Sequence, residues 1–297
     1  MSAARELLVG LIARRAPRAA TVWLEEAARE LGLARDEPAA QFPTLVSLAS
    51  RHVPRGPLAP TDVERSQAWD VIEGWNPERW SLLDAARAVL VLSRRDAAEP
   101  GVVTALEECF RYADVGELVA LHRTLALLPE PARFAWRAGE GCRSSMRAVF
   151  EAAACDTPLP WSVFDDVAWR QLVVKALFVE APLWRVYGLD QRLDAELARM
   201  ALDLADERRS AGRPVYPELW LCLGRHAGER GRAALEKELA GTNRAGRRAA
   251  AIALARGGDI ERLSELCQAE RDPPVRATME SALKGRIHQG AFQDLAA

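Results

Sequence analysis

The sequence predicts an all-α fold, a right-handed helical array or solenoid with HEAT-like helix pairs at its C-terminus. Three observations support this fold. The chain of 297 residues is rich in Ala, Leu, Arg and Glu, which favour helices. Its apolar residues recur at helical spacing, and one short segment is repeated near the C-terminus. With 49% hydrophobic and 28% charged residues, the composition is that of a globular protein.

Helical periodicity, broken at Pro and Gly, predicts the individual elements in chain order. In the first half we expect helices over residues 2–15, 20–31, 62–73, 80–94, 102–112 and 115–128. Residues 36–60 contain five prolines, so we expect an irregular segment there with one short helix near residues 45–50. Beyond Gly139 and Gly141 we expect helices over residues 142–154, 166–180 and 195–211.

The clearest internal similarity lies in residues 233–297. Asn243-Arg-Ala-Gly-Arg247 and the Ala-rich segment after it match Asp272-Pro-Pro-Val-Arg276 and the segment after that, at an offset of 29 residues. A polar turn, an Arg at the start of the second helix and small residues at the packing face resemble the HEAT repeat. Because one helix pair cannot bury its apolar stripe alone, we expect the preceding helices to extend or cap the stack.

We expect three regions within one continuous structural unit. Pro129 and Pro131 end the helices of an N-terminal helical region, residues 1–130. A central helical region covers residues 131–232. The HEAT-like repeats then occupy residues 233–297.

Charge and cysteine usage predict a cytoplasmic protein that does not bind nucleic acid. The formal charge is −2, so no general attraction to DNA or RNA is expected. The five cysteines are widely separated and contain no CxxC pair, which favours neither a disulfide framework nor a zinc site. No apolar run reaches the roughly 20 residues that span a bilayer, so we expect no transmembrane segment. Charged residues flank residues 7–13, which indicates a first helix and no signal peptide.

Two stretches of the sequence carry a family resemblance. One runs from Trp75-Asn-Pro-Glu-Arg-Trp80 to Arg87. The more specific one covers residues 141–220 and includes Arg143-Ser-Ser-Met-Arg-Ala-Val-Phe150, Phe164-Asp-Asp-Val-Ala-Trp169 and Gln171-Leu-Val-Val-Lys-Ala-Leu-Phe178. These segments resemble the EboA-domain family, and the resemblance implies a bacterial gene neighbourhood that also encodes a membrane prenyltransferase and several enzyme-like partners. It further implies a role in the trafficking of secondary metabolites, with no biochemical activity assigned to the family itself.

The chain departs from the family pattern at three places. Ser145 and Arg170 stand where the family pattern has Asn, and Thr157-Pro-Leu-Pro160 stands where it has Asn-Pro-Tyr-Pro. Any family function that depends on those Asn side chains is therefore in doubt for this chain.

Motifs that would name a reaction are missing from the sequence. It contains no GxSxG nucleophile elbow, no GxxxxGK phosphate loop and no HExxH zinc motif, and Gly139-Glu-Gly141 does not extend into a dinucleotide fingerprint. Cys222 and His226 lie one helical turn apart, but two ligands are too few for a metal without further partners. We therefore predict no catalytic residue, no metal and no cofactor, and favour a protein that is not an enzyme.

Lys175 is the first candidate for a ligand-binding residue, because it interrupts an apolar run on a predicted helix. It could bind an anion or form a Schiff base, although an ion pair or a side chain extended to solvent is commoner. Asp203 shares a face with two more acids, but arginines interleave with them as on a solvated helix. Trp169 falls on an apolar stripe typical of core. The candidate ligand-binding set is Lys175, Gln171, Asp203 and Trp169.

A basic stretch is the candidate surface for a partner. Residues 225–256 contain eight Arg or Lys against three Glu, a local excess of positive charge in a chain of net charge −2. This stretch could receive an acidic partner or a phosphate-bearing ligand. The alternative is that these arginines brace the turns of the helix pairs. The candidate partner-binding residues are Arg225, Arg244, Arg247 and Arg248.

Together these features favour a non-catalytic helical binding or scaffold protein in the transport or trafficking of a bacterial secondary metabolite. It would act through protein partners, including the prenyltransferase and other products of the same gene cluster, or through an apolar ligand. Two alternatives stay open. One is an enzyme or enzyme subunit that uses Lys175 and carboxylates in an interior pocket, and the other is a carrier that shields a prenylated or aromatic small molecule.

Overall fold

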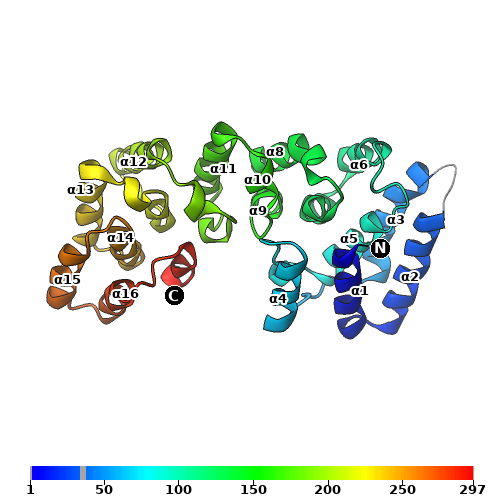
Figure 1. Ribbon diagram of the computed structural model, residues 1–297, viewed down its shortest axis with the longest axis horizontal. Coiled ribbons are helices and arrows are strands. Elements are labelled where there is room, and N and C mark those ends of the chain that lie inside the picture. The colour runs from blue at the N-terminus through cyan, green and yellow to red at the C-terminus, as the bar shows by residue number, and fades with distance from the viewer. Residues whose placement is uncertain (1, 34–37, 297) are drawn as a thin grey trace. The chain divides into compact units, whose positions relative to one another are not determined.

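The computed structural model describes residues 2–33 and 38–296, which form helices and connecting loops without a strand (Figure 1). An isolated antiparallel bridge joins Pro57 and Ser81. The predicted all-α class is confirmed. None of the described helices is both long and apolar enough to cross a membrane. The chain divides into two compact units, Met1–Trp169 (unit 1) and Arg170–Ala297 (unit 2).

Unit 1 consists of α-helices of up to four turns joined by short 3₁₀ segments. Its elements are α1 (Ala3–Arg15), α2 (Arg18–Leu33), α3 (Pro38–His52), α4 (Asp62–Val71), η1 (Pro77–Arg79), α5 (Leu82–Leu92), α6 (Gly101–Tyr112), α7 (Val115–Thr124), η2 (Leu125–Leu127), η3 (Pro131–Phe134), α8 (Ala135–Arg143), α9 (Arg147–Ala154) and α10 (Leu159–Val163). Helix α11 (Asp166–Val179) begins in unit 1 and continues into unit 2.

Helix α5 forms the centre of unit 1. Every residue from Leu82 to Leu92 is buried, and α1, α2, α3 and α7 pack around the helix. A helix that is apolar nearly all round must be covered on all sides, which explains its central place. The sequence spacing of Leu82, Ala86, Val89 and Leu90 therefore marks only part of a fully buried surface.

Among the described residues of unit 1, three helices begin with a capping box, in which the third helical residue accepts a hydrogen bond from the backbone of the capping residue. The three carboxylates are Glu64 in α4, Asp84 in α5 and Glu117 in α7. Each also binds an arginine of another helix, through the pairs Arg15–Glu64, Arg123–Asp84 and Arg87–Glu117. Helices α5 and α7 thus exchange two ion pairs reciprocally. A single carboxylate in each case both starts its helix and fixes a neighbouring one.

The segment 36–60 is more helical than the sequence predicts, because α3 runs from Pro38 to His52 with Pro43 inside it. A proline inside a helix removes one hydrogen bond and costs about 3 kcal/mol. Phe42, Val46 and Ala49 are buried on the same helix, which packs against α2 and α5. Burial of these side chains offsets the cost of Pro43. The prediction of a short helix near residues 45–50 was therefore wrong in length.

The predicted helix over residues 142–154 is also corrected. The chain forms α8 up to Arg143, is interrupted at Ser144, and resumes as α9 at Arg147. Gly139 and Gly141 lie inside α8, although the sequence suggested that they precede a helix. A Cβ atom at Gly141 would lie 2.5 Å from the ring of His122 and 2.6 Å from Cβ of Ala153. This glycine therefore permits close packing of α8 against α7 and α9, at the cost of helix propensity.

Unit 2 continues with the rest of α11 and contains further α-helices and 3₁₀ segments. Its elements are η4 (Leu183–Arg185), η5 (Leu189–Arg192), α12 (Ala195–Ser210), η6 (Pro217–Cys222), η7 (Gly224–His226), α13 (Gly228–Leu239), α14 (Arg244–Arg256), α15 (Ile260–Ala269), α16 (Pro273–Leu283) and η8 (Gln289–Ala296). Helix α14 packs against α13, α15, α16 and η8. The Ala-rich side of α14 is buried, and its small side chains allow the close approach of these neighbours.

The two segments that match in sequence make the same local contact. Arg247 of α14 donates a hydrogen bond from Nε to the carbonyl of Leu239 at 3.0 Å, at the end of α13. Arg276 of α16 donates from Nε to the carbonyl of Glu270 at 2.9 Å, just after α15. Each arginine satisfies a carbonyl that the preceding helix leaves without an internal donor. The internal similarity therefore corresponds to a repeated helix–turn–helix contact.

Candidate functional site

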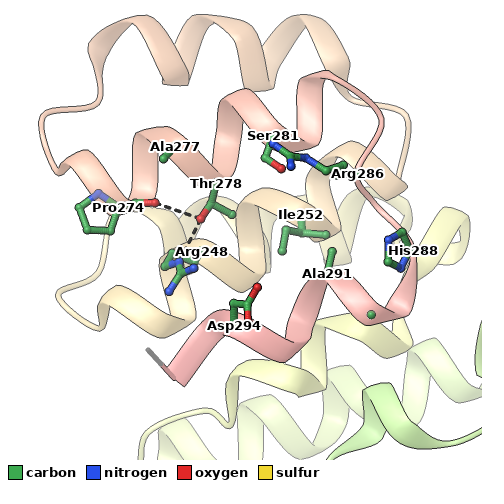
Figure 2. Close-up of a pocket in the computed structure, with 11 residues that line it drawn as sticks. Arg248, Ile252, Pro274, Ala277, Thr278, Ser281, Arg286, His288, Ala291 and Asp294 are labelled. Atoms are coloured by element: carbon green, nitrogen blue, oxygen red, sulfur yellow. Dashed lines mark hydrogen bonds between the residues drawn. The ribbon is translucent and has the colours of Figure 1, made fainter. Parts of the chain in front are cut away.

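Two adjoining cavities in unit 2 form the candidate site. The first, which we name the α16 cavity, is an open depression of about 540 Å³ between α14, α16 and η8 (Figure 2). The second, the η7 cavity, is an open depression of about 660 Å³ next to η5, η7 and the end of α14. His288 lines both cavities, so they meet at this residue. Volumes of this size suit a small organic molecule.

The α16 cavity combines basic, hydroxyl and apolar side chains. Figure 2 shows Ile252 and Ala291 on facing elements around the space, with Thr278 on α16. Arg248 donates from Nε to Oγ1 of Thr278 at 2.9 Å, and that hydroxyl donates to the carbonyl of Pro274 at 3.0 Å (Figure 2). The remaining lining residues are Ala277, Ser281, Arg286, His288, Gly290 and Asp294.

The η7 cavity is lined by basic, acidic and apolar residues. Its lining residues are Asp190, Gln191, Leu193, Gly224, Arg225, His226, Arg256, Gly285, Ile287 and His288. The side chain of Arg256 is 7% exposed and binds Asp190 at 2.7 Å, so this charge is neutralised by its neighbour. Arg256 also donates to the carbonyl of Ile287 at 2.6 Å.

A hydrogen-bonded clasp positions the segment that carries Arg286 and His288. Gln289 donates from Nε2 to the carbonyls of Trp184 at 2.8 Å and Val186 at 2.9 Å. Its backbone N–H donates to Asp190 at 2.9 Å, and its Oε1 accepts from the backbone of Asp190 at 3.2 Å. Because Ile287 is held by Arg256, the residues on either side of it are fixed at the boundary between the two cavities.

Positive charge exceeds negative charge in this site. The two cavities are lined by four arginines, Arg225, Arg248, Arg256 and Arg286, against two aspartates, Asp190 and Asp294. Within the described part of the chain, the guanidinium groups of Arg225 and Arg286 have no hydrogen bond or ion pair to another residue. His226 and His288 add imidazole rings to this lining. The arrangement can therefore attract and hold an anionic group.

The four predicted partner-binding arginines separate into two groups. Arg225 and Arg248 line the cavities. Arg244 binds Asp272 at 2.9 Å, and Arg247 binds Glu270. The second pair thus links successive helix turns, as expected for bracing arginines. Only part of the basic stretch is directed toward a cavity.

The four predicted ligand-binding residues line neither cavity. Trp169 is buried on α11, where Gln171 is exposed and Lys175 is half-buried. Asp203 lies on α12 and binds Arg199 at 2.5 Å and Arg230 at 2.8 Å. Its carboxylate therefore belongs to an exposed network of ion pairs between α12 and α13.

No group of three or more His, Cys, Asp or Glu side chains in the described part of the chain is placed to hold a metal ion. Cys222 is fully buried, and burial raises the pKa of its thiol to about 12. Its neighbour in sequence, His226, instead lines the η7 cavity.

Sequence reasoning did not find Arg286 and His288, which join Arg248 in the lining of the α16 cavity only after the chain folds back; His288 also joins Arg225 at the η7 cavity. The available signal was weak: a short basic segment after Gly285, which has a positive φ of 84° and ends α16.

A comparison with protein-family models gives a match. A protein-family model described as "Metabolite traffic protein EboA" matches residues 4–224, more than half of the chain. No curated protein and no solved structure matches it. The matched segment ends at the start of η7, so helices α13–α16 and the α16 cavity lie beyond it.

Proposed function

The chain belongs to the EboA family of metabolite traffic proteins, and on that premise we propose that it is a non-catalytic helical binding protein. It acts in the trafficking of a bacterial secondary metabolite. One observation carries the proposal: two adjoining cavities of small-molecule size have basic rims on which Arg225 and Arg286 are free to meet a ligand. Such a site binds, and needs no reacting group to do so.

We further propose that α13–α16 form two compact HEAT-like repeats at the end of a right-handed solenoid. The equivalent bonds of Arg247 and Arg276 to the ends of the preceding helices support this arrangement. The packing of α14 against α16, together with the Arg244–Asp272 pair between their N-terminal turns, also supports it. Stacked helix pairs offer a continuous surface to a partner.

The alternative of an enzyme built on Lys175 requires carboxylates near that amine. Asp203, the carboxylate named for this role, is held by Arg199 and Arg230 on an exposed helix face. No specific contact of the described residues favours this alternative over a binding role. Direct measurement of turnover on any recovered metabolite decides between the two.

Protein partners and location also belong to this proposal. The partners are products of the same gene cluster, including the membrane prenyltransferase that the family resemblance implies. The protein acts in the cytoplasm, where its five free cysteines stay reduced. The basic rim of the cavities and the exposed arginines of α13 and α14 are the contact surface.

Affinity purification from the native host tests the proposal. An N-terminally tagged chain is isolated in parallel with the double variant Arg225→Gln/Arg286→Gln and the control Arg271→Gln, and bound proteins and small molecules are identified by mass spectrometry. Arg271 is exposed, lies in unit 2 and lines neither cavity. We expect a metabolite or gene-cluster partner with the wild type and the control. Recovery of neither from the wild type would falsify the proposed function, as would conversion of the metabolite by the purified protein alone.

A further inference from the structure

We propose that the joined cavities bind an organic anion, a molecule with an apolar body and one phosphate or carboxylate group. The anionic group lies at His288, which lines both cavities; Arg286 lines the α16 cavity on one side of it, and Arg225 lines the η7 cavity on the other. This inference rests on the proposed binding function and names its ligand class. The site lies largely beyond the residues matched by the family model.

We infer a negatively charged ligand from two arginines at the site, because they bind no carboxylate of the described chain. Several exposed arginines of unit 2 bind carboxylates, as in Arg230–Asp206 at 2.7 Å and Arg262–Glu236 at 3.0 Å. Arg213 and Arg271 bind none among the described residues, but they line neither cavity. Arg225 and Arg286 line cavities and bind no carboxylate of the described chain. Guanidinium groups with five donors and no acceptor are suited to phosphate and carboxylate oxygens.

We infer that the ligand has an apolar part because apolar side chains line both cavities. Ile252, Ala277 and Ala291 line the α16 cavity (Figure 2), and Leu193 and Ile287 line the η7 cavity. A fully hydrated inorganic ion would leave these walls in contact with water. An apolar chain or ring removes their surface from water, which favours binding.

The clasp makes the site ready before a ligand arrives. Arg256 holds the carbonyl of Ile287, and Gln289 is bound to Trp184, Val186 and Asp190. Arg286 and His288 therefore extend from a backbone that is fixed on both sides. A site whose backbone is already ordered loses less entropy when it binds.

Isothermal titration calorimetry with probes of one chain length tests the inference. Octyl phosphate, octanoate and octanol are titrated into the full chain, into Arg225→Gln/Arg286→Gln/His288→Gln and into the control Arg271→Gln. We expect octyl phosphate or octanoate to bind the wild type at least tenfold more tightly than octanol does. The triple variant should lose at least tenfold in affinity for the anion, while the control stays within twofold. The better of the two anions identifies the head group.

Three results would overturn the inference. Octanol could bind as tightly as the anions, or the folded triple variant could keep the wild-type affinity, with folding verified by circular dichroism. An acidic peptide could also bind at these residues while neither octyl anion does, which would assign the surface to a protein segment. If a native metabolite co-purifies equally with the wild type and the triple variant, the proposed binding function stands and this site is wrong.

Discussion

The two units use arginine differently. In unit 1, Arg87 and Arg123 lie between α5 and α7 and bind the carboxylates that start those helices. In unit 2, some arginines of α13 and α14 form more exposed pairs, such as Arg232–Asp259 and Arg244–Asp272. Arg225 and Arg286 at the cavities bind no carboxylate of the described chain. Charge in unit 1 therefore fixes helix positions, whereas part of the charge in unit 2 is available to a ligand.

The largest expected effect comes from removing a buried arginine of unit 1. Arg87 is 2% exposed, donates to the carbonyl of Val46 at 3.1 Å and lies 3.5 Å from Glu117. In Arg87→Met the carboxylate of Glu117 loses its buried partner, and we expect a loss of about 3–5 kcal/mol in the free energy of unfolding. Urea denaturation measures it. Arg225→Gln is the matched control in unit 2, with an expected change within about 0.5 kcal/mol. Equal losses in the two variants would contradict the contrast between the units.

Acid should destabilise unit 1 through His122. Burial lowers the pKa of this imidazole to about 4 from the ordinary 6.5. Because the unfolded chain takes up a proton below pH 6.5 and the folded chain does not, stability is complete above pH 6.5 and declines until pH reaches about 4. We expect His122 to account for a loss of about 2–3 kcal/mol between pH 7 and 4.5. Urea denaturation of wild type and His122→Leu at both pH values isolates this contribution. The same pH dependence in both proteins would rule it out.

Two glycines of α8 test the packing of unit 1, with a smaller expected effect on stability. Gly141→Ala places a Cβ against His122 and Ala153, so we expect a loss of about 1–3 kcal/mol from overpacking. At Gly139 the nearest atom to a new Cβ is the flexible end of Arg143 at 3.3 Å. Gly139→Ala should therefore be neutral or stabilise by up to about 1 kcal/mol, as helix propensity alone predicts. Thermal unfolding of both variants compares them, and a larger loss at Gly139 would show that the tight contact lies elsewhere.

The smallest expected effect concerns an exposed pair of unit 2. Arg244 binds Asp272, and the arginine side chain is 61% exposed. Arg244→Gln should change the free energy of unfolding by less than about 1 kcal/mol, and the change should shrink further in high salt. Urea denaturation at low and high salt measures both. A loss comparable to that of Arg87→Met would mean that this turn is as essential as the core of unit 1.

Sequence patterns predict most helices because local periodicity and capping residues act within a few turns. The errors occur where distant contacts decide. Pro43 is tolerated because Phe42 and Val46 are buried by other helices, and Gly141 lies within a helix because His122 and Ala153 approach it closely. Neither contact is visible in the local sequence.

The candidate site also combines residues that the local sequence indicates with residues that only the fold brings to the site. Arg225 and Arg248 belong to a dense basic stretch that composition reveals directly. Arg286 and His288 reach them because Gln289 binds Trp184 and Val186, more than a hundred residues earlier in the chain. Lys175 stood out as a charge in an apolar run, but half-burial lets its head reach solvent. A single charged residue in an apolar run, such as Lys175, is therefore a weaker guide to a site than several basic residues that the fold brings together.

The clasp between Gln289 and residues 184–190 also affects the order in which the nascent chain folds. Contacts between residues so distant in sequence form late, because the intervening chain must first be ordered. Before η8 has been synthesised, the carbonyls of Trp184 and Val186 lack the hydrogen bonds that Gln289 donates to them. The core of unit 2 also lacks the buried side chain of Phe292. Unit 2 is therefore completed only after η8 has been synthesised and its contacts with residues 184–190 have formed.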